Sequence, residues 1–154
     1  MMLVTPLLFL TGCGGNSSPN ITANDFALTI EVKENKIPLG EAFVVSVSLR
    51  NNSGRAVIIH ASGDFFVINL PGTLYDDMYF TQPAVELIMQ ADETIEKQFY
   101  VGQLYLGDKN FSNWLEEGIY ALSITSNFFV GDINISILSE KIELEVANGI
   151  GGKP

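Results

Sequence analysis

Apolar and polar residues alternate with a period of two through most of the chain after Phe26. In the segment 43–50, every second residue is Phe, Val or Leu, and the positions between them are Val, Ser, Ser and Arg. Because a β-strand turns successive side chains to opposite faces, this pattern predicts strands with one buried face. Weaker forms of the pattern predict strands in the segments 28–32, 56–60, 65–70, 85–90, 95–101, 118–126 and 134–146.

Clusters of Gly, Pro, Asn and Asp separate these segments, and no segment has helical periodicity. Seven or eight short strands within about 120 residues are typical of an all-β antiparallel sandwich. A closed barrel is the alternative. The last segment, 134–146, is expected to form one long strand that closes the domain.

The motif Glu116-Glu117-Gly118-Ile119-Tyr120 precedes the alternating run at 120–124. It resembles the tyrosine corner of immunoglobulin-like sandwiches, in which a Tyr near the start of a strand turns its hydroxyl back onto upstream backbone. The resemblance implies an immunoglobulin-like fold in which Tyr120 has a structural role. Gly118 is expected to ease a tight entry into the strand. Leu122 stands where an antibody domain has its second Cys, so the resemblance is to sandwiches without a disulfide.

The N-terminal segment is a short apolar run, Met1 to Leu10, followed by Thr11-Gly12-Cys13 and a stretch rich in Gly, Asn and Ser. The run is too short to span a bilayer. An apolar core followed by small residues is typical of an export signal. Leu10-Thr11-Gly12-Cys13 resembles the lipobox of bacterial lipoproteins, which implies cleavage before Cys13 and lipidation of its thiol.

This interpretation divides the chain into a signal peptide (1–12), a lipidated cysteine with a flexible tether (13–24), a β-sandwich (25–147) and a loose tail (148–154). It places the protein at the cell envelope, held on a membrane by lipid on Cys13. Gly14 is not Asp, which favours the outer membrane if the host is Gram-negative. The leader has no Lys or Arg, so we expect a longer leader upstream. The alternative is a buried N-terminal strand with an unmodified Cys13.

Charge excludes one class of partner. The 154 residues carry a formal net charge of −10, and the eight Lys and Arg are scattered singly. Nucleic-acid binding needs a basic stripe that releases counterions, so no nucleic-acid partner is expected. Cys13 is the only cysteine, so neither a disulfide within the chain nor a cysteine-based metal site can form.

Catalytic motifs are missing from the sequence. It has one histidine, no Gly-x-Ser-x-Gly elbow, no phosphate loop and no metal-ligand spacing. His60 lies close in sequence to Ser62 and Asp64, but three residues of one turn have no scaffold to orient them as a triad. We therefore expect no enzyme activity, no cofactor and no metal.

The segment 72–81 is the candidate binding loop, because it combines aromatic residues with two acids. Such residues form hot spots in protein interfaces or stack on sugar rings. The alternative is that two or three of them fold into the core. Calcium binding is less expected than a solvated acidic turn, because the acids lack the spacing of a calcium loop. The candidate residues are Tyr75, Asp76, Asp77, Met78, Tyr79 and Phe80.

The order of motifs between Ala42 and Ser126 resembles the BsuPI-type intracellular proteinase inhibitor domain. The similarity rests on a strand that ends in Asn51-Asn52, the segments Ser62-Gly63-Asp64-Phe65-Phe66-Val67-Ile68 and Phe80-Thr81-Gln82-Pro83, and the later Gly118-x-Tyr120. It implies an immunoglobulin-like domain that binds a protein partner, a proteinase among the candidates. A structural spacer of the envelope and a glycan-binding module remain alternative functions.

Overall fold

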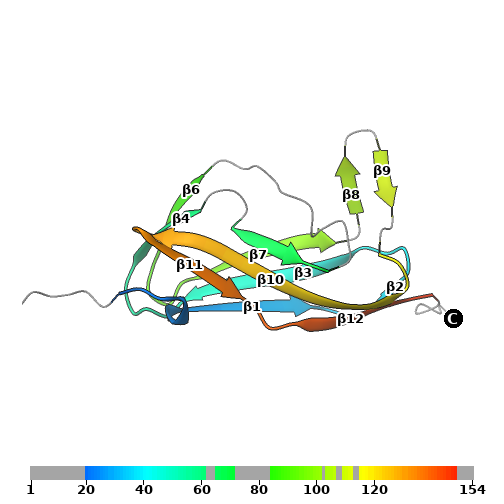
Figure 1. Cartoon of the computed structure of the whole chain (residues 1–154), viewed down its shortest axis with the longest axis horizontal. Helices are drawn as coiled ribbons and strands as arrows, with labels where there is room; N and C mark the ends of the chain where they lie inside the picture. Colours follow the sequence, from blue (N-terminus) through cyan, green and yellow to red (C-terminus); the bar gives the residue numbers. More distant parts are fainter. Residues whose placement is uncertain are drawn as a thin grey trace, which may run out of the picture.

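A computed structural model describes residues 20–61, 65–71, 84–101, 103–106, 109–112 and 115–148 of the chain, and gives the backbone alone for 103–106 and 109–112. One short 3-10 helix precedes twelve strands in this part of the chain (Figure 1). The elements are η1 (Ala23–Asp25), β1 (Phe26–Val32), β2 (Lys36–Pro38), β3 (Phe43–Asn51), β4 (Val57–Ala61), β5 (Phe66–Asn69), β6 (Val85–Met89), β7 (Thr94–Val101), β8 (Gln103–Leu106), β9 (Lys109–Ser112), β10 (Gly118–Val130), β11 (Ile133–Leu138) and β12 (Ile142–Ala147).

The strands form two sheets around a common core, and a separate hairpin. The smaller sheet has the order β1-β3-β7, and the larger sheet has the order β2-β12-β10-β4-β6, with β5 and β11 also paired to β10. Every strand pair is antiparallel except β2 with β12. This arrangement confirms the predicted immunoglobulin-like β-sandwich. The strands outnumber the seven or eight expected because the short β2 and the hairpin β8–β9 carry no clear alternation and because one predicted strand, 134–146, is divided into β11 and β12.

The smaller sheet follows the predicted alternation closely. Along β3, Phe43, Val45, Val47 and Leu49 are buried, while the residues between them face outward. The apolar residues of β1 pack against the same core. The register pairs Val47 with both Ile30 and Lys97, so β3 is the central strand of this sheet.

The last predicted strand, 134–146, is wrong as a single element. Between the pairs Leu122–Ile142 and Thr125–Leu138, two residues of β10 lie opposite three residues, 139–141. This extra residue is a β-bulge, which shifts the alternation by one position. The side chain of Ser139 takes the place of a ladder partner, because its Oγ accepts a hydrogen bond from the backbone N–H of Ile124 at 2.9 Å.

Aromatic rings join the two sheets through the core. Phe26 of β1 and Phe128 of β10 meet edge to face, with their ring centroids 5.0 Å apart. Phe65 also packs against Phe128, with 5.4 Å between ring centroids. Offset and edge-on aromatic pairs of this kind add about 1 kcal/mol to the burial of the rings.

Residues just before β1 pack against the sandwich. Ile21 is buried in the core cluster. The carboxylate of Asp25 accepts hydrogen bonds from the backbone N–H and the hydroxyl of Thr22, at 2.7 and 3.1 Å. This reciprocal capping holds η1 at the entrance to β1. Cys13 lies outside the described residues.

Candidate binding surface

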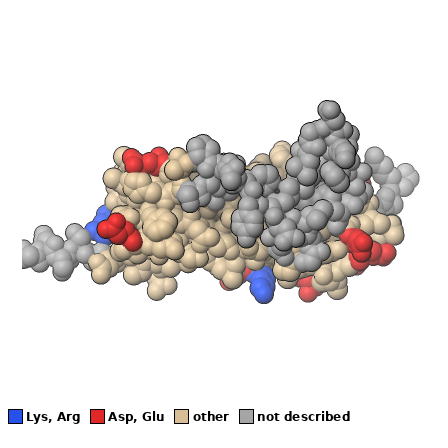
Figure 2. All heavy atoms as spheres, turned by 45° about the horizontal axis from the view of Figure 1, so that its top comes forward, with Lys and Arg blue, Asp and Glu red and all other residues tan. Residues whose placement is uncertain are grey.

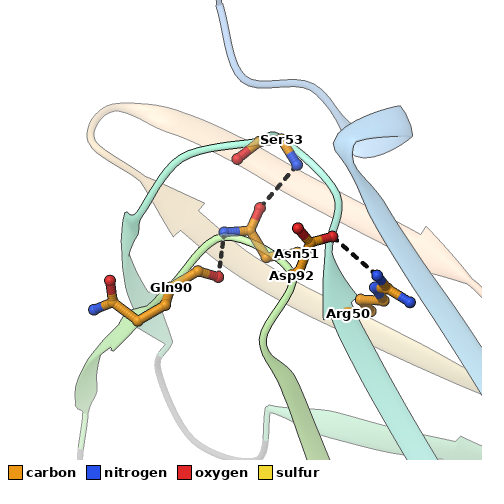
Figure 3. Close-up of polar contacts among 5 residues, drawn as sticks. All are labelled: Arg50, Asn51, Ser53, Gln90 and Asp92. Atoms are coloured by element: carbon orange, nitrogen blue, oxygen red, sulfur yellow. Dashed lines mark hydrogen bonds and ion pairs between the residues drawn. The ribbon is translucent and has the colours of Figure 1, made fainter.

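The side chain of Asn51 makes four hydrogen bonds, and its role is structural. It is fully buried at the end of β3. Its amide nitrogen donates to the carbonyl oxygens of Arg55 at 2.7 Å, Met89 at 3.2 Å and Gln90 at 2.9 Å. Its side-chain oxygen accepts from the backbone N–H of Ser53 at 3.0 Å (Figure 3). The amide thus satisfies backbone groups of two turns and leaves no atom for a ligand.

An exposed ion pair lies beside this amide. Arg50 Nη2 and Asp92 Oδ1 are 2.9 Å apart, and both side chains are more than half exposed (Figure 3). Asp92 has a φ of +62°, a left-handed conformation that Asp tolerates better than most residues. The pair shapes the turn between β6 and β7, and exposed pairs contribute less than about 1 kcal/mol to stability.

Tyr120 lies near the start of β10, half-buried, and its hydroxyl donates a hydrogen bond to the carbonyl oxygen of Glu116 at 2.9 Å. This is the contact that defines a tyrosine corner. The geometry of this hydrogen bond does not require a glycine at position 118. A Cβ at Gly118 would lie 3.7 Å from the Tyr120 ring, an ordinary contact, and the glycines with positive φ are Gly40, Gly54 and Gly131.

His60 faces outward from β4, where its Nδ1 lies 3.3 Å from Oε2 of Glu86 on the neighbouring β6. Ser62 and Asp64 lie outside the described residues, so the structure does not test the triad hypothesis. The candidate loop residues, Tyr75, Asp76, Asp77, Met78, Tyr79 and Phe80, also lie outside the described residues.

The outward face of the larger sheet is unusually apolar. On the β4–β6 pair, Ile58 lies directly opposite Ile88, and these residues are 48% and 60% exposed. Phe129 of β10 lies opposite His60 in the next row and is 44% exposed. Two rows further along β10, Thr125 lies between Val67 and Leu138, both of them exposed. We call these five apolar residues the apolar face: Ile58, Val67, Ile88, Phe129 and Leu138.

Charges on the same side of this sheet are mainly acidic. Glu86 lies beside His60 at one end, and Glu143 and Glu145 face outward at the other end, opposite Ala121 and Ile119. Lys36 of β2 is 3.1 Å from Glu145, so this lysine is already paired. In the view of Figure 2, acidic side chains lie towards both ends of the described surface, and a basic side chain lies between them near the lower edge.

This surface was not predicted, although the sequence contains a signal for it. Strict alternation breaks at Ile58-Ile59, Leu87-Ile88 and Phe128-Phe129, where two large apolar residues are adjacent. In a strand, one of two adjacent residues must face away from the core. An adjacent apolar pair in a strand with one buried face therefore marks an exposed apolar position.

Within the described ranges, no three His, Cys, Asp or Glu side chains come together as a metal site. No helix in this part of the chain is long and apolar enough to cross a membrane.

Comparison with known proteins adds little. No protein-family model matches the chain, and no curated protein matches its sequence. Among solved structures, the CARDB domain of PF1109 from Pyrococcus furiosus, crystallised with di-metal ions, is 12% identical with a TM-score of 0.48, over 80% of this chain and 94% of that one. A β-glucosidase from Listeria innocua in complex with glucose is 16% identical with a TM-score of 0.41, over 80% of this chain and 16% of that one. These similarities are too low to bear on function, and the fold class rests on the sheets described above.

Proposed function

We propose that the chain is a lipid-anchored protein-binding domain of the cell envelope, which engages its partner through the apolar face. The anchor rests on the lipobox that ends at Cys13. The binding role rests on the apolar face, because several large apolar side chains exposed on one face of a sheet are typical of an interaction site.

The charges beside the apolar face indicate what kind of partner would fit. Glu86, Glu143 and Glu145 share that side of the sheet, and the whole chain carries a formal net charge of −10. A second copy of this chain would bring like charges together. A partner with an apolar patch bordered by Lys and Arg would instead meet complementary charge, which raises the association rate and favours that partner over others.

A photo-crosslinking amino acid at Ile88 or Phe129 tests this proposal in the anchored full chain. We expect crosslinks from both positions to one partner, which mass spectrometry identifies. The matched control places the same amino acid at Gln98, on the opposite sheet, and we expect no crosslink to that partner there. Equal crosslinking from Gln98, or no crosslinking from either test position, would overturn the proposal.

Binding to the purified partner supplies the second measurement. The double substitution Ile58→Ser and Ile88→Ser removes two exposed side chains without touching the core. We expect it to weaken binding at least tenfold, or about 1.4 kcal/mol. The affinity for the native protein should also fall as salt is raised, because exposed complementary charges are screened.

Proteinase inhibition is a second candidate function, which would use the segment 72–81 instead of the apolar face. It rests on the resemblance to the BsuPI-type domain, and its candidate loop, 72–81, lies outside the described residues. The envelope spacer and the glycan-binding loop stay as alternatives. The crosslinking experiment separates both of them from the protein-binding proposal, because neither alternative requires a protein partner at the apolar face.

A further inference from the structure

The outward face of the smaller sheet contains a shallow trough along its central strand. The outward positions in the middle of β3 are Ser46 and Ser48, two of the smallest polar side chains. The positions beside them on β1 and β7 carry longer side chains. Short side chains between long ones leave a hollow of about 240 Å³. We call this hollow the β3 trough, and its polar lining consists of Thr29, Glu31, Ser46, Ser48, Glu96, Lys97 and Gln98.

The register places these groups in two rows across the sheet. One row is Thr29, Ser48 and Glu96, and the next is Glu31, Ser46 and Gln98. Each row therefore has a hydroxyl in the middle and a carboxylate at one end, and the carboxylates lie on opposite sides of the trough. The hydroxyl oxygens of Thr29 and Ser48 are 2.6 Å apart, so a hydrogen bond between them fixes the floor of the first row.

A third row adds an aromatic ring. Tyr100 lies opposite Val44, one row beyond Gln98, and is 69% exposed. From Ser48 to Val44 the strand covers four residues, or about 14 Å at the usual strand rise. The three rows together form a strip in which hydrogen-bonding groups lead to an exposed ring.

We propose that the β3 trough binds a neutral oligosaccharide. Carboxylates accept hydrogen bonds from sugar hydroxyls, and the hydroxyl and amide groups of the trough both donate and accept. The apolar face of a sugar ring packs on an aromatic side chain such as Tyr100. The length of the strip suits more than one sugar ring. Lys97 also lines the trough, but its Nζ lies over the Phe99 ring, 4.7 Å from the centroid. The two carboxylates of Glu31 and Glu96 outnumber this one lysine, which favours a neutral saccharide over an acidic one.

A divalent cation fits the trough less well. Calcium takes six to eight oxygen ligands that converge at short distance. Glu31 and Glu96 are on strands that flank β3 and lie in different rows, so their carboxylates are spread along the trough. This site is independent of the apolar face, which belongs to the other sheet.

The test is an NMR titration of the isotope-labelled full chain with neutral tetrasaccharides of glucose, mannose, galactose and N-acetylglucosamine. We expect at least one of them to shift backbone resonances of residues 29–31, 46–48 and 96–100 with a dissociation constant below about 1 mM. Resonances of Ile58, Ile88 and Phe129 should stay unchanged. Shifts confined to the β3 trough would support saccharide binding there, whether or not the apolar face binds a protein.

Two substitutions assign the binding to the trough. Glu96→Gln removes the negative charge of one hydrogen-bond acceptor. Ser48→Val removes a hydroxyl and occupies part of the β3 trough with methyl groups, and Val is well tolerated in a strand. We expect each to weaken binding at least fivefold, whereas Glu86→Gln, on the other sheet, should bind as the native protein does. The proposal is overturned if no tetrasaccharide at about 10 mM shifts the backbone resonances of the trough residues. It is also overturned if Ser48→Val binds as tightly as the native protein, or if calcium chloride alone reproduces the shifts.

Discussion

The side-chain amide of Asn51 donates a hydrogen bond to the carbonyl oxygen of Gln90 at 2.9 Å, and this contact links the two sheets. Asn51 ends β3 of the smaller sheet, and Gln90 follows β6 of the larger sheet. The backbone strengthens the link, because Asp92 N–H donates to the Asn51 carbonyl at 2.8 Å and Asn51 N–H donates to Glu93 at 3.0 Å. One buried residue therefore holds the turn that carries the chain from one sheet to the other.

Asn51→Ala should lower the free energy of unfolding by about 3 kcal/mol. The substitution leaves buried carbonyl groups without their donor, and each such loss costs about 1–3 kcal/mol before relaxation. The matched control is Asn52→Ala, whose side chain is exposed and whose effect should stay within about 0.5 kcal/mol. Urea denaturation of both variants measures the difference. Equal stability of the two would show that solvent or a rearranged turn replaces the Asn51 amide.

Gly131 and Gly118 should respond differently to the same change. Gly131 has a φ of +59° in the two-residue turn between β10 and β11, with open space around its missing Cβ. Gly131→Ala should therefore cost about 1–2 kcal/mol through backbone strain alone. Gly118→Ala should be neutral or slightly stabilising, because its Cβ would make an ordinary contact and alanine reduces the freedom of the unfolded chain. Thermal unfolding of both variants checks the contrast, and a larger loss at Gly118 would contradict it.

Tyr120→Phe should lower stability by about 1 kcal/mol. The ring stays in place, and only the hydrogen bond to the Glu116 carbonyl is lost. Tyr120→Leu should cost more, because it also removes part of the ring packing. A Tyr120→Phe variant as stable as the native protein would show that water satisfies the Glu116 carbonyl equally well.

Period-two alternation was sufficient to predict most of the strands but not their interruptions. The bulge at 139–141 is visible in retrospect as a change of phase. Apolar residues occupy odd positions from Ile133 to Ile137 and even positions from Ile142 to Val146. A continuous strand cannot keep both sets on one face, so a phase change within a long apolar run predicts an inserted residue.

The binding surfaces were harder to predict because they depend on which strands become neighbours. The β3 trough needs Ser46 and Ser48 beside Glu31 and Glu96, and only the register of three strands brings these residues together. The local pattern predicts which face of the sheet a side chain lies on. Strand pairing across long sequence separations determines which residues lie next to it. The alternation of apolar and polar residues therefore predicts the fold class but gives little information about where binding surfaces lie.

Cys13→Ser should abolish labelling of the protein by a radioactive fatty acid fed to growing cells. The thiol is the attachment point in the lipobox interpretation, and no other cysteine can replace it. The variant should also move from the membrane fraction to the soluble fraction, because acyl chains supply about 0.8 kcal/mol for each buried methylene. Equal labelling of Cys13→Ser would contradict lipidation at this residue.

Inhibition of serine proteinases should depend on the segment 72–81 if the resemblance to the BsuPI-type domain extends to activity. We expect the full chain to inhibit at least one member of a proteinase panel at micromolar concentration. A Tyr79→Ala and Phe80→Ala double variant should inhibit more weakly, while Ile88→Ser, on the apolar face, should not change inhibition. Absence of inhibition by the native chain would remove this activity and leave the broader protein-binding proposal to the crosslinking experiment.

The pairing of β10 has a consequence for how the domain folds. This one strand forms ladders with β4, β5, β11 and β12, whose residues extend from Val57 to Ala147. The ladders with β4 and β5 join residues far apart in the sequence, and contacts of such long separation slow folding. The larger sheet cannot be completed until residues up to Ala147 are available, so the complete sandwich forms only after synthesis has reached that residue.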